Sequence, residues 1–218
     1  GSAEVGAYSI VFSNVGSVEA GDGSDNVTAS GIGADLTDTD NELKASGITF
    51  TDIQTANLDG QTLAGTDTKD EIFDISTAAN QVAVNGMNLT SVAAIDAGSS
   101  ATDAITTTEL VDADLTTENN ALTASGIKFT NVNSADLSQG QLTGTDTDNE
   151  IFEISTTANQ VAVNGMNLTS VAAIDAGSST GDEITTTESV DAKLTGTDNE
   201  LTASGIDFSA INNADLSN

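Results

Sequence analysis

The sequence predicts an all-β fold, a parallel β-helix or β-solenoid, and three observations support this prediction. The segment NQVAVNGMNLTSVAAIDAGSS at residues 80–100 recurs unchanged at residues 159–179. Apolar and polar residues alternate over short stretches, which is typical of β-strands with one buried face. Glycine, asparagine and serine separate these stretches and allow the chain to turn. Stacked turns of a repeat array account for all three observations.

The long repeat has a period of about 79 residues and extends over almost the whole chain, in about 2.7 copies. Because one repeated unit fills the chain, we interpret residues 1–218 as a single solenoid domain, with residues 1–4 in part a cloning remnant. We expect the chain to be an excerpt of a longer protein. Aligning the chain with itself at this period superimposes Leu43, Leu122 and Leu201; Gly47, Gly126 and Gly205; Phe50, Phe129 and Phe208; and Phe73 with Phe152.

Shorter periods lie inside this repeat. Strand-like starts divide each half-repeat again, which predicts an elementary coil of about 20 residues. About eleven such coils, stacked at roughly 4.8 Å, would give a rod about 50 Å long. The crossover rule favours right-handed winding. The half-repeat itself, of about 40 residues, is marked by Ser-Gly or Asn-Gly dipeptides: Ser46-Gly47, Asn85-Gly86, Ser125-Gly126, Asn164-Gly165 and Ser204-Gly205.

The segment LTASGIKFTNVNSADLSQG, residues 122–140, shows the local pattern. Its apolar residues come in alternating pairs, which predicts three short strands per coil. We interpret the glycine and polar residues between the pairs as corners of the coil. Helices are not expected, because no stretch has apolar residues at helical spacing. The residues predicted to point inward are Leu122, Ala124, Ile127, Phe129, Val132, Ala135 and Leu137.

The charge of the chain excludes some partners. It has 34 acidic residues against four basic ones, and a formal net charge of −30. Such a surface repels nucleic acids and anionic membranes, so we expect no nucleic-acid binding. No apolar run is long enough to cross a bilayer, so no membrane insertion is expected either. The chain has no cysteine, so a continuous hydrophobic core must hold the fold without disulfides.

Residue types argue against an enzyme. The chain has no histidine, cysteine or arginine, and therefore no imidazole base, thiol nucleophile or guanidinium group. Acidic residues such as Asp148, Glu150, Asp182 and Glu183 leave a carboxylate-pair glycosidase open on residue type alone. Acidic residues occur throughout the chain, so these pairs are not specific. We predict no catalytic site.

One segment predicts a metal site. AGDGSDNVT, residues 20–28, nearly matches the calcium-binding nonapeptide repeat of β-rolls, with Gly21 and Gly23 in the turn and Asp25 as the carboxylate. Calcium is the one cofactor that the sequence suggests. The alternative is that these residues form turns through their own side chains, because calcium sites of this kind need tandem motifs. Echoes of the motif's tail occur singly at Asn41, Asp70, Asp103, Asn120, Asn149, Asp182 and Asn199.

A threonine motif suggests another ligand. Thr-x-Thr places two hydroxyls and two methyls on one face of a strand, the arrangement that solenoid ice-binding proteins present in rows. In rows on alternate coils, the motifs would be spaced at roughly 9.6 Å. Outward threonine is also simply a good strand residue, so ice binding is an alternative function. The motifs recur with the half-repeat, at Thr66 and Thr68, Thr106 and Thr108, Thr145 and Thr147, and Thr185 and Thr187.

Longer runs resemble a known group of proteins. LTGTDTDNEIFEISTTANQVAVNGMNLTSVAAIDAGSSTGDEI, residues 142–184, resembles the repeats, each about 40 residues long and rich in Gly, Thr and Asp, of very large bacterial surface proteins. These are the filamentous-haemagglutinin-like and calcium-repeat adhesins, and the resemblance covers about Gly6 to Asn218. It implies a secreted, cell-surface or biofilm-associated stalk that binds a cell-surface or matrix ligand. The chain departs from the calcium-repeat pattern because it lacks tandem glycine turns.

These observations together predict a rigid, acidic structural segment of an extracellular bacterial adhesin. A calcium-binding solenoid module and an ice-binding solenoid are the alternatives. The two ends of an excerpted solenoid would expose unpaired strand edges, so a cap, a partner or end-to-end self-association is also expected.

Overall fold

The computed structural model describes residues 15–216, which form 24 β-strands and no helix, and therefore no helix that could cross a membrane. The predicted all-β solenoid is confirmed, with about six turns. The N-terminal residues interpreted as a cloning remnant lie outside the described part. The strands are β1 (Ser17–Glu19), β2 (Asn26–Thr28), β3 (Ala34–Leu36), β4 (Leu43–Ala45), β5 (Ile48–Thr51), β6 (Thr55–Ala64), β7 (Ile72–Ile75), β8 (Gln81–Val84), β9 (Met87–Asp96), β10 (Ala104–Thr107), β11 (Ala113–Leu115), β12 (Leu122–Ala124), β13 (Ile127–Thr130), β14 (Ser134–Asp136), β15 (Gln141–Thr143), β16 (Ile151–Ile154), β17 (Val161–Val163), β18 (Met166–Thr169), β19 (Ala173–Asp175), β20 (Glu183–Thr186), β21 (Ala192–Leu194), β22 (Leu201–Ala203), β23 (Ile206–Ser209) and β24 (Asn213–Asp215).

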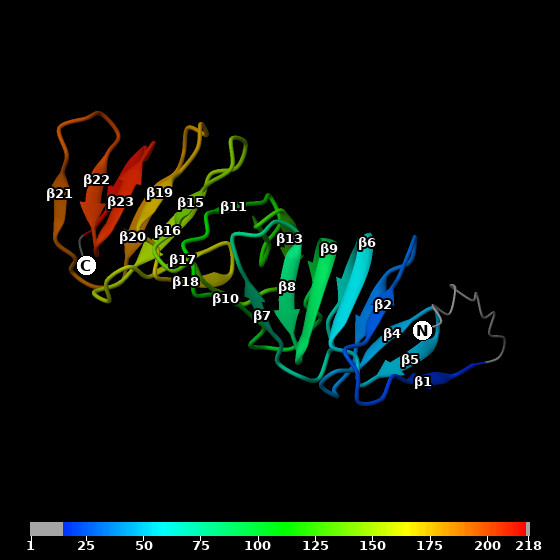
Figure 1. The fold of residues 1–218 in the computed structure, drawn as a ribbon. Helices are drawn as coiled ribbons and strands as arrows, with labels where there is room; N and C mark the ends of the chain where they lie inside the picture. The colour runs from blue at the N-terminus through cyan, green and yellow to red at the C-terminus, as the bar shows by residue number, and fades with distance from the viewer. Residues whose placement is uncertain (1–14, 217–218) are drawn as a thin grey trace, which may run out of the picture.

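The strands are arranged in two hydrogen-bonded ladders that run along an elongated molecule, with the chain ends at its opposite ends (Figure 1). Ladder 1 has the order β1-β5-β4-β3-β6-β9-β13-β12-β11-β15-β19-β23-β22-β21. Ladder 2 has the order β2-β6-β9-β8-β7-β10-β14-β18-β17-β16-β20-β24. Strands β6 and β9 join the ladders, because the first half of each pairs in ladder 2 and the second half in ladder 1.

Each ladder combines parallel pairs with antiparallel meanders of three strands. The meanders β3-β4-β5, β11-β12-β13 and β21-β22-β23 lie in ladder 1. The meanders β7-β8-β9 and β16-β17-β18 lie in ladder 2. Successive meanders therefore alternate between the ladders. This alternation gives the two periods of the sequence a structural meaning: one half-repeat separates meanders on opposite ladders, and one full repeat returns to the same ladder.

The predicted coil of about 20 residues is wrong, and so are the eleven coils that it implied. Parallel neighbours are about 30 residues apart in the chain, as in Asn26 beside Thr55, Ser17 beside Thr49 and Lys128 beside Ala94. The error lies at the Ser-Gly and Asn-Gly dipeptides, which we interpreted as corners of a coil. They are the two-residue loops of antiparallel hairpins within the meanders.

The hairpin loops explain the choice of residues at the dipeptides. Ser46 and Gly47 have φ angles of 51° and 76°, and Asn164 and Gly165 have 48° and 82°. Two successive positive φ angles are the mark of a type I′ turn, whose twist matches that of the flanking strands. Glycine takes this conformation without steric cost, and asparagine tolerates it better than most residues. The sequence signal was therefore one for a hairpin.

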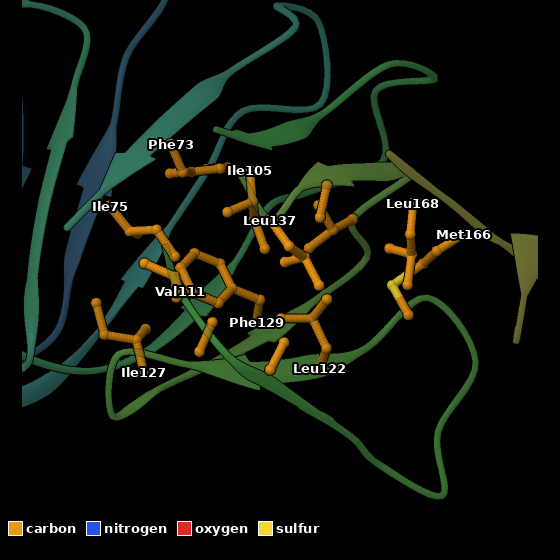
Figure 2. Close-up of a cluster of buried hydrophobic side chains, with 14 of the residues drawn as sticks. Phe73, Ile75, Ile105, Val111, Leu122, Ile127, Phe129, Leu137, Met166 and Leu168 are labelled. Atoms are coloured by element: carbon orange, nitrogen blue, oxygen red, sulfur yellow. The ribbon is translucent and has the colours of Figure 1, made fainter. Parts of the chain in front are cut away.

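The core lies between the two ladders (Figure 2). Phe73 of ladder 2 meets Phe129 of ladder 1 edge to face, with ring centroids 6.0 Å apart, and Phe152 meets Phe208 in the same way at 6.3 Å. Such pairs add to the stabilisation that burial gives. The inward residues predicted from the segment 122–140 are all buried, so that prediction is confirmed.

Asparagine residues bind each meander to the next one on the opposite ladder. Asn120, just before β12, has a φ of 57°. Its side-chain Nδ2 donates to the carbonyl oxygens of Val132 and of Gly165, at 3.2 and 3.4 Å, and its backbone N–H donates to the carbonyl of Asn164 at 2.7 Å. Gly165 belongs to a hairpin of ladder 2, whereas Asn120 belongs to a meander of ladder 1. Asn80 and Asn159 make the equivalent bonds.

Candidate functional site

The most unusual group of side chains is a buried polar column at the corner before the ladder 2 strands β7 and β10. Glu71 and Asp103 are fully buried. The Glu71 N–H donates to Asp103 Oδ1 at 2.8 Å, and the Asp103 N–H donates to Asn133 Oδ1 at 3.1 Å. The Thr66 hydroxyl donates to Glu71 Oε1 at 2.7 Å. The Asp103 and Asn133 side chains thus each accept a backbone N–H of the neighbouring turn, which a buried corner would otherwise leave unpaired.

The same column recurs in the next full repeat. The Glu150 N–H donates to Asp182 Oδ1 at 2.9 Å, and the Asp182 N–H donates to Asn212 Oδ1 at 3.1 Å. The Thr145 hydroxyl donates to Glu150 Oε1 at 2.5 Å. Glu150 and Asp182 are 1% and 0% exposed. Among residues 15–216, two successive copies of the repeat therefore each bury one pair of acidic residues. The two residues of each pair lie on adjacent turns.

Burial changes the acidity of these pairs. Burial raises the pKa of Glu71, hydrogen bonds from Thr66 oppose this rise, and the nearby Asp103 adds to it. Burial also raises the pKa of Asp103. Burial raises the pKa of Glu150, again with a hydrogen bond to Asp182 and the charge of Asp182 in the same direction. The raised pKa values of Glu71, Asp103 and Glu150 favour the protonated form of these three side chains.

The unpartnered oxygens of the columns fit a shared proton better than a metal ion. Asp103 Oδ2, Glu150 Oε2 and Asp182 Oδ2 are buried and accept no hydrogen bond within the described chain. One proton held between the carboxyls of a pair would satisfy such oxygens. Calcium takes six to eight oxygen ligands, whereas the remaining oxygens here already accept N–H and O–H donors. Among residues 15–216 no three acidic side chains come together as a metal-binding group.

The predicted calcium motif occupies the same position in the fold as these columns. Asp25 directly precedes the ladder 2 strand β2, as Asp103 precedes β10, and its N–H donates to Gln54 Oε1 at 2.8 Å. Gly21 has a φ of 89°, and Gly23 packs so closely that a Cβ there would lie 3.1 Å from Asp25 Oδ2. Asp25 Oδ2 is buried without a hydrogen-bond partner in the described chain. A calcium ion there would need further oxygen ligands besides this one carboxylate, such as backbone carbonyls and water. Calcium binding stays a prediction.

Several echoes of the calcium motif are turn residues. Asn41, Asn120 and Asn199 have φ angles of 58°, 57° and 62°, and all three precede the middle strand of a ladder 1 meander. Their backbone carbonyls accept the N–H groups of residues that follow the last strand of each meander, Ile53, Val132 and Ile211. The alternative interpretation, in which side chains of these residues form the turns, agrees with Asn120, whose Nδ2 donates to the carbonyl of Val132. At Asn41 and Asn199 the bonds across the turn come from the backbone.

Two of the Thr-x-Thr motifs lie in bends outside the strands. The hydroxyls of Thr66 and Thr145 point into the protein and donate to Glu71 and Glu150. They therefore serve the buried columns and do not present an outward row. The second residues of these motifs, Thr68 and Thr147, are exposed in the same bends.

The other two motifs lie at strands of ladder 2. Thr106 of β10 has Asp74 as its neighbour in register, and Thr185 of β20 lies between Glu153 and Asp215. The outward rows thus alternate threonine with acidic residues, and the four motifs do not form one threonine array. Thr108 and Thr187 lie just beyond the ends of these strands and are exposed. Ice binding stays a prediction.

The acidic residues that left a glycosidase open are not all accessible. Glu150 and Asp182 are buried partners of one column, so neither reaches a polysaccharide at the surface. Asp148 is exposed and Glu183 is half-buried. Sequence reasoning missed the columns because acidic residues are frequent here. The available signal was the recurrence of Glu71 and Glu150 directly before an Ile-Phe pair of a strand.

Comparison with known proteins finds no relatives of this chain: no family model, no curated protein and no solved structure matches it. The resemblance to adhesin repeats therefore stays a prediction.

Proposed function

We propose that this chain is a structural segment, a stalk, of a secreted or cell-surface bacterial adhesin that takes part in biofilms. The observation that carries the proposal is the interlocking of the two ladders along the molecule. Asparagines tie successive meanders to a hairpin of the next meander on the opposite ladder. A domain with a single binding site does not need these asparagine bonds in every repeat. An extended spacer needs them along its whole length.

The surface supports the same proposal. A net charge of −30 keeps such chains soluble and mutually repelling. The core contains Phe, Leu, Ile, Val and Ala from both ladders and continues from Ala29 to Ile211. A continuous core without disulfides allows the segment to lengthen by adding units. We retain right-handed winding as part of this proposal, because the crossover rule favours it.

A length experiment tests the stalk. A second copy of residues 80–158 inserted after residue 158 adds one full repeat, which contributes five strands to each ladder. Small-angle X-ray scattering should then show a maximum dimension larger by roughly 24 Å, five strand spacings, with the cross-section unchanged. A thicker particle of unchanged length would contradict the proposal.

Calcium binding is the second candidate function, and one observation favours it: Asp25 Oδ2 is buried without a hydrogen-bond partner in the described chain. Thermal unfolding by circular dichroism in excess chelator and in millimolar calcium tests it. A ligand that binds only the native state raises the midpoint. The same midpoint in both buffers would leave Gly21, Gly23 and Asp25 as a turn.

End-to-end association belongs to the proposal as well. Strand β21 forms the C-terminal edge of ladder 1, and Leu194 on it is 79% exposed. Leu201 and Ile211 line a hollow of about 400 Å³ beside it. An open sheet edge next to apolar side chains favours pairing with another strand. Analytical ultracentrifugation of the parent and of Leu194→Lys tests this, and we expect weaker association for the variant.

A further inference from the structure

Two matching grooves lie on the outer face of ladder 2, one over each of its meanders. Their volumes are about 240 and 320 Å³. The first is lined by residues of β7, β8 and β9, from Asp74 to Thr90, together with Thr108 and Glu109. The second repeats ten of these positions in the next full repeat, from Glu153 to Thr187. Two copies of one hollow indicate that it is a regular property of the repeat.

A small residue at the centre of each meander makes the groove. Ala83 lies in register between Asp74 and Asn88, and Ala162 lies between Glu153 and Asn167. The neighbours on both sides are longer polar side chains, so the sheet surface is lowest at the alanine. Cross-strand neighbours stand close enough to form the walls of such a hollow.

The walls of the groove offer free hydrogen-bonding groups. The side-chain amides of Gln81, Asn88, Gln160 and Asn167 are exposed and make no hydrogen bond to the described part of the chain. Each amide can donate and accept at once. A pair of groups with both capacities matches the hydroxyl groups of a sugar ring.

The charged residues on the groove walls limit the class of ligand that the grooves can bind. No lysine lines either groove, and Glu153 is the one acidic residue on the walls of the second. In the first, Asp74 and Glu109 are both on the walls, and the N–H and hydroxyl of Thr77, both 2.9 Å from Glu109 Oε2, lower the pKa of Glu109 and favour its charged form. Anionic ligands are therefore repelled. Neutral amides and hydroxyls outnumber the carboxylates on the walls of both grooves, and this composition favours a neutral ligand.

We propose that the two grooves bind a neutral, hydroxyl-rich polysaccharide. Amides and threonine hydroxyls bind its hydroxyl groups, and the alanine methyl contacts the C–H face of a sugar ring. The exposed Ile72 and Ile151, two residues before Asp74 and Glu153 on the same strand face, extend this apolar contact. The grooves lie five strands apart along ladder 2, roughly 24 Å, so one polymer chain reaches both. This ligand site goes beyond the stalk and does not depend on it.

Titration with defined sugars tests the proposal. The probes are maltohexaose, cellohexaose and laminarihexaose, with a pentalysine peptide as the cationic probe and an alginate oligomer as the anionic one. Two-dimensional ¹⁵N NMR follows the side-chain amide signals of Gln81, Asn88, Gln160 and Asn167. We expect at least one neutral oligosaccharide to shift these signals together in a saturable manner, and the alginate oligomer to leave them unchanged.

Matched variants separate the grooves from the rest of the surface. Ala83→Lys with Ala162→Lys fills both hollows, and we expect at least a tenfold loss of affinity. Thr123→Lys places the same side chain at the centre of a ladder 1 meander, where it should leave binding unchanged. Ala83→Lys alone should halve the number of sites and remove the gain in affinity that a longer polymer has from binding two grooves.

The outcomes test the proposed polysaccharide site independently of the proposed stalk function. Loss of binding at an unchanged unfolding midpoint in the double lysine variant supports the groove. Three outcomes overturn it: no neutral oligosaccharide shifts the amide signals, pentalysine alone shifts them, or Thr123→Lys weakens sugar binding as much as the double variant does. The stalk proposal survives each of these, because it is tested by the length of the particle.

Discussion

The meanders of the two ladders have the same backbone and the same kind of inward side chains, but their outer faces differ. Inward, Leu122 and Phe129 of ladder 1 correspond to Val161 and Leu168 of ladder 2, and all are buried. Outward, the centre of a ladder 1 meander is lysine in the first copy and threonine in the next two, whereas both copies in ladder 2 have alanine. The central outward residues are Lys44, Thr123 and Thr202 in ladder 1, and Ala83 and Ala162 in ladder 2.

This difference shows which residues of a meander folding requires and which positions can vary. Both ladders need inward apolar residues and hairpin glycines with positive φ, so these recur in both. Folding does not require a particular outward residue on a meander, since ladder 1 tolerates lysine, threonine and aspartate there. The unchanged segment at 80–100 and 159–179 covers the middle and last strands of the ladder 2 meanders. Its inward, turn and outward residues are all constant, and the constancy of the outward ones is what the proposed groove ligand would require.

The largest expected effect tests whether the ladders contribute equally to the core. Phe73→Ala and Phe129→Ala each remove one ring of an edge-to-face pair between the ladders. Each should lower the free energy of unfolding by about 3–5 kcal/mol. Because the two rings share one contact, the double variant should lose less than the sum. Urea unfolding measures all three, and a loss at one ladder only would contradict an equal contribution.

A pair of glycine variants tests the lock between ladders. Gly47 and Gly165 occupy the same hairpin position, with φ angles of 76° and 82°. A Cβ at Gly47 meets nothing within 4 Å, whereas a Cβ at Gly165 would lie 2.4 Å from Asn120 Oδ1. Gly47→Ala should cost about 1–2 kcal/mol from backbone strain. Gly165→Ala should cost about 1–3 kcal/mol more, because it displaces the asparagine from the carbonyls that it binds. Equal midpoints in urea would show that the asparagine bonds contribute nothing.

The acidic columns should make ladder 2 sensitive to pH. The raised pKa values of Glu71 and Glu150 mean that the folded state holds protons more tightly than the unfolded chain. Their contribution to stability is complete below the ordinary value of 4.5 and is lost as the pH rises through the raised value. Glu71→Gln with Glu150→Gln should therefore flatten the fall in stability above that ordinary value, by about 1.4 kcal/mol for each unit of pKa displacement.

Asp70→Asn gives this experiment a control of opposite sign. Hydrogen bonds from Ser100 and Thr102 lower the pKa of Asp70. Its contribution is present above its ordinary value of 3.8 and is lost as the pH falls. Asp70→Asn should therefore lower stability at pH values above 3.8 and have no effect at a pH well below that value. If the two glutamine substitutions leave the pH profile of unfolding unchanged, the raised pKa values of Glu71 and Glu150 do not contribute to stability.

The smallest effects are expected at the outer faces. Lys128→Gln removes an exposed ion pair with Glu118, whose nitrogen and oxygen are 3.0 Å apart. Asn88→Ala removes an exposed amide from a groove. Each should change the free energy of unfolding by less than about 0.5 kcal/mol. A larger loss for Asn88→Ala would mean that the constant face of ladder 2 serves stability, which would remove the contrast with ladder 1.

Much of the fold could be predicted from the sequence because the inward residues are periodic. Alternation at Leu122, Ala124, Ile127 and Phe129 identified two strands and their buried face correctly. The coil length could not be obtained from the same pattern, because a hairpin and a solenoid corner both join two alternating strands through glycine. The decisive information is which strands pair in parallel, and that depends on contacts between distant parts of the chain.

The candidate sites were harder to predict for a different reason. Thr66 and Thr145 appeared as outward hydroxyls, but the bend turns them toward buried glutamates. Acidic residues on the surface and in the columns look alike in sequence, and only burial separates Glu71 from its neighbours. The grooves form because a small alanine lies in register between two longer side chains. This register has to be known before the groove can be predicted.

The alternation of meanders decides which changes of length the fold accepts. The two identical segments at 80–100 and 159–179 lie one full repeat apart, so inserting or deleting the residues between equivalent positions changes the chain by one full repeat. Such a step keeps every meander on its own ladder and every asparagine opposite its hairpin. A change of one half-repeat would place neighbouring meanders on the same ladder and leave their locks without partners. The fold therefore accepts a change of length only in pairs of meanders.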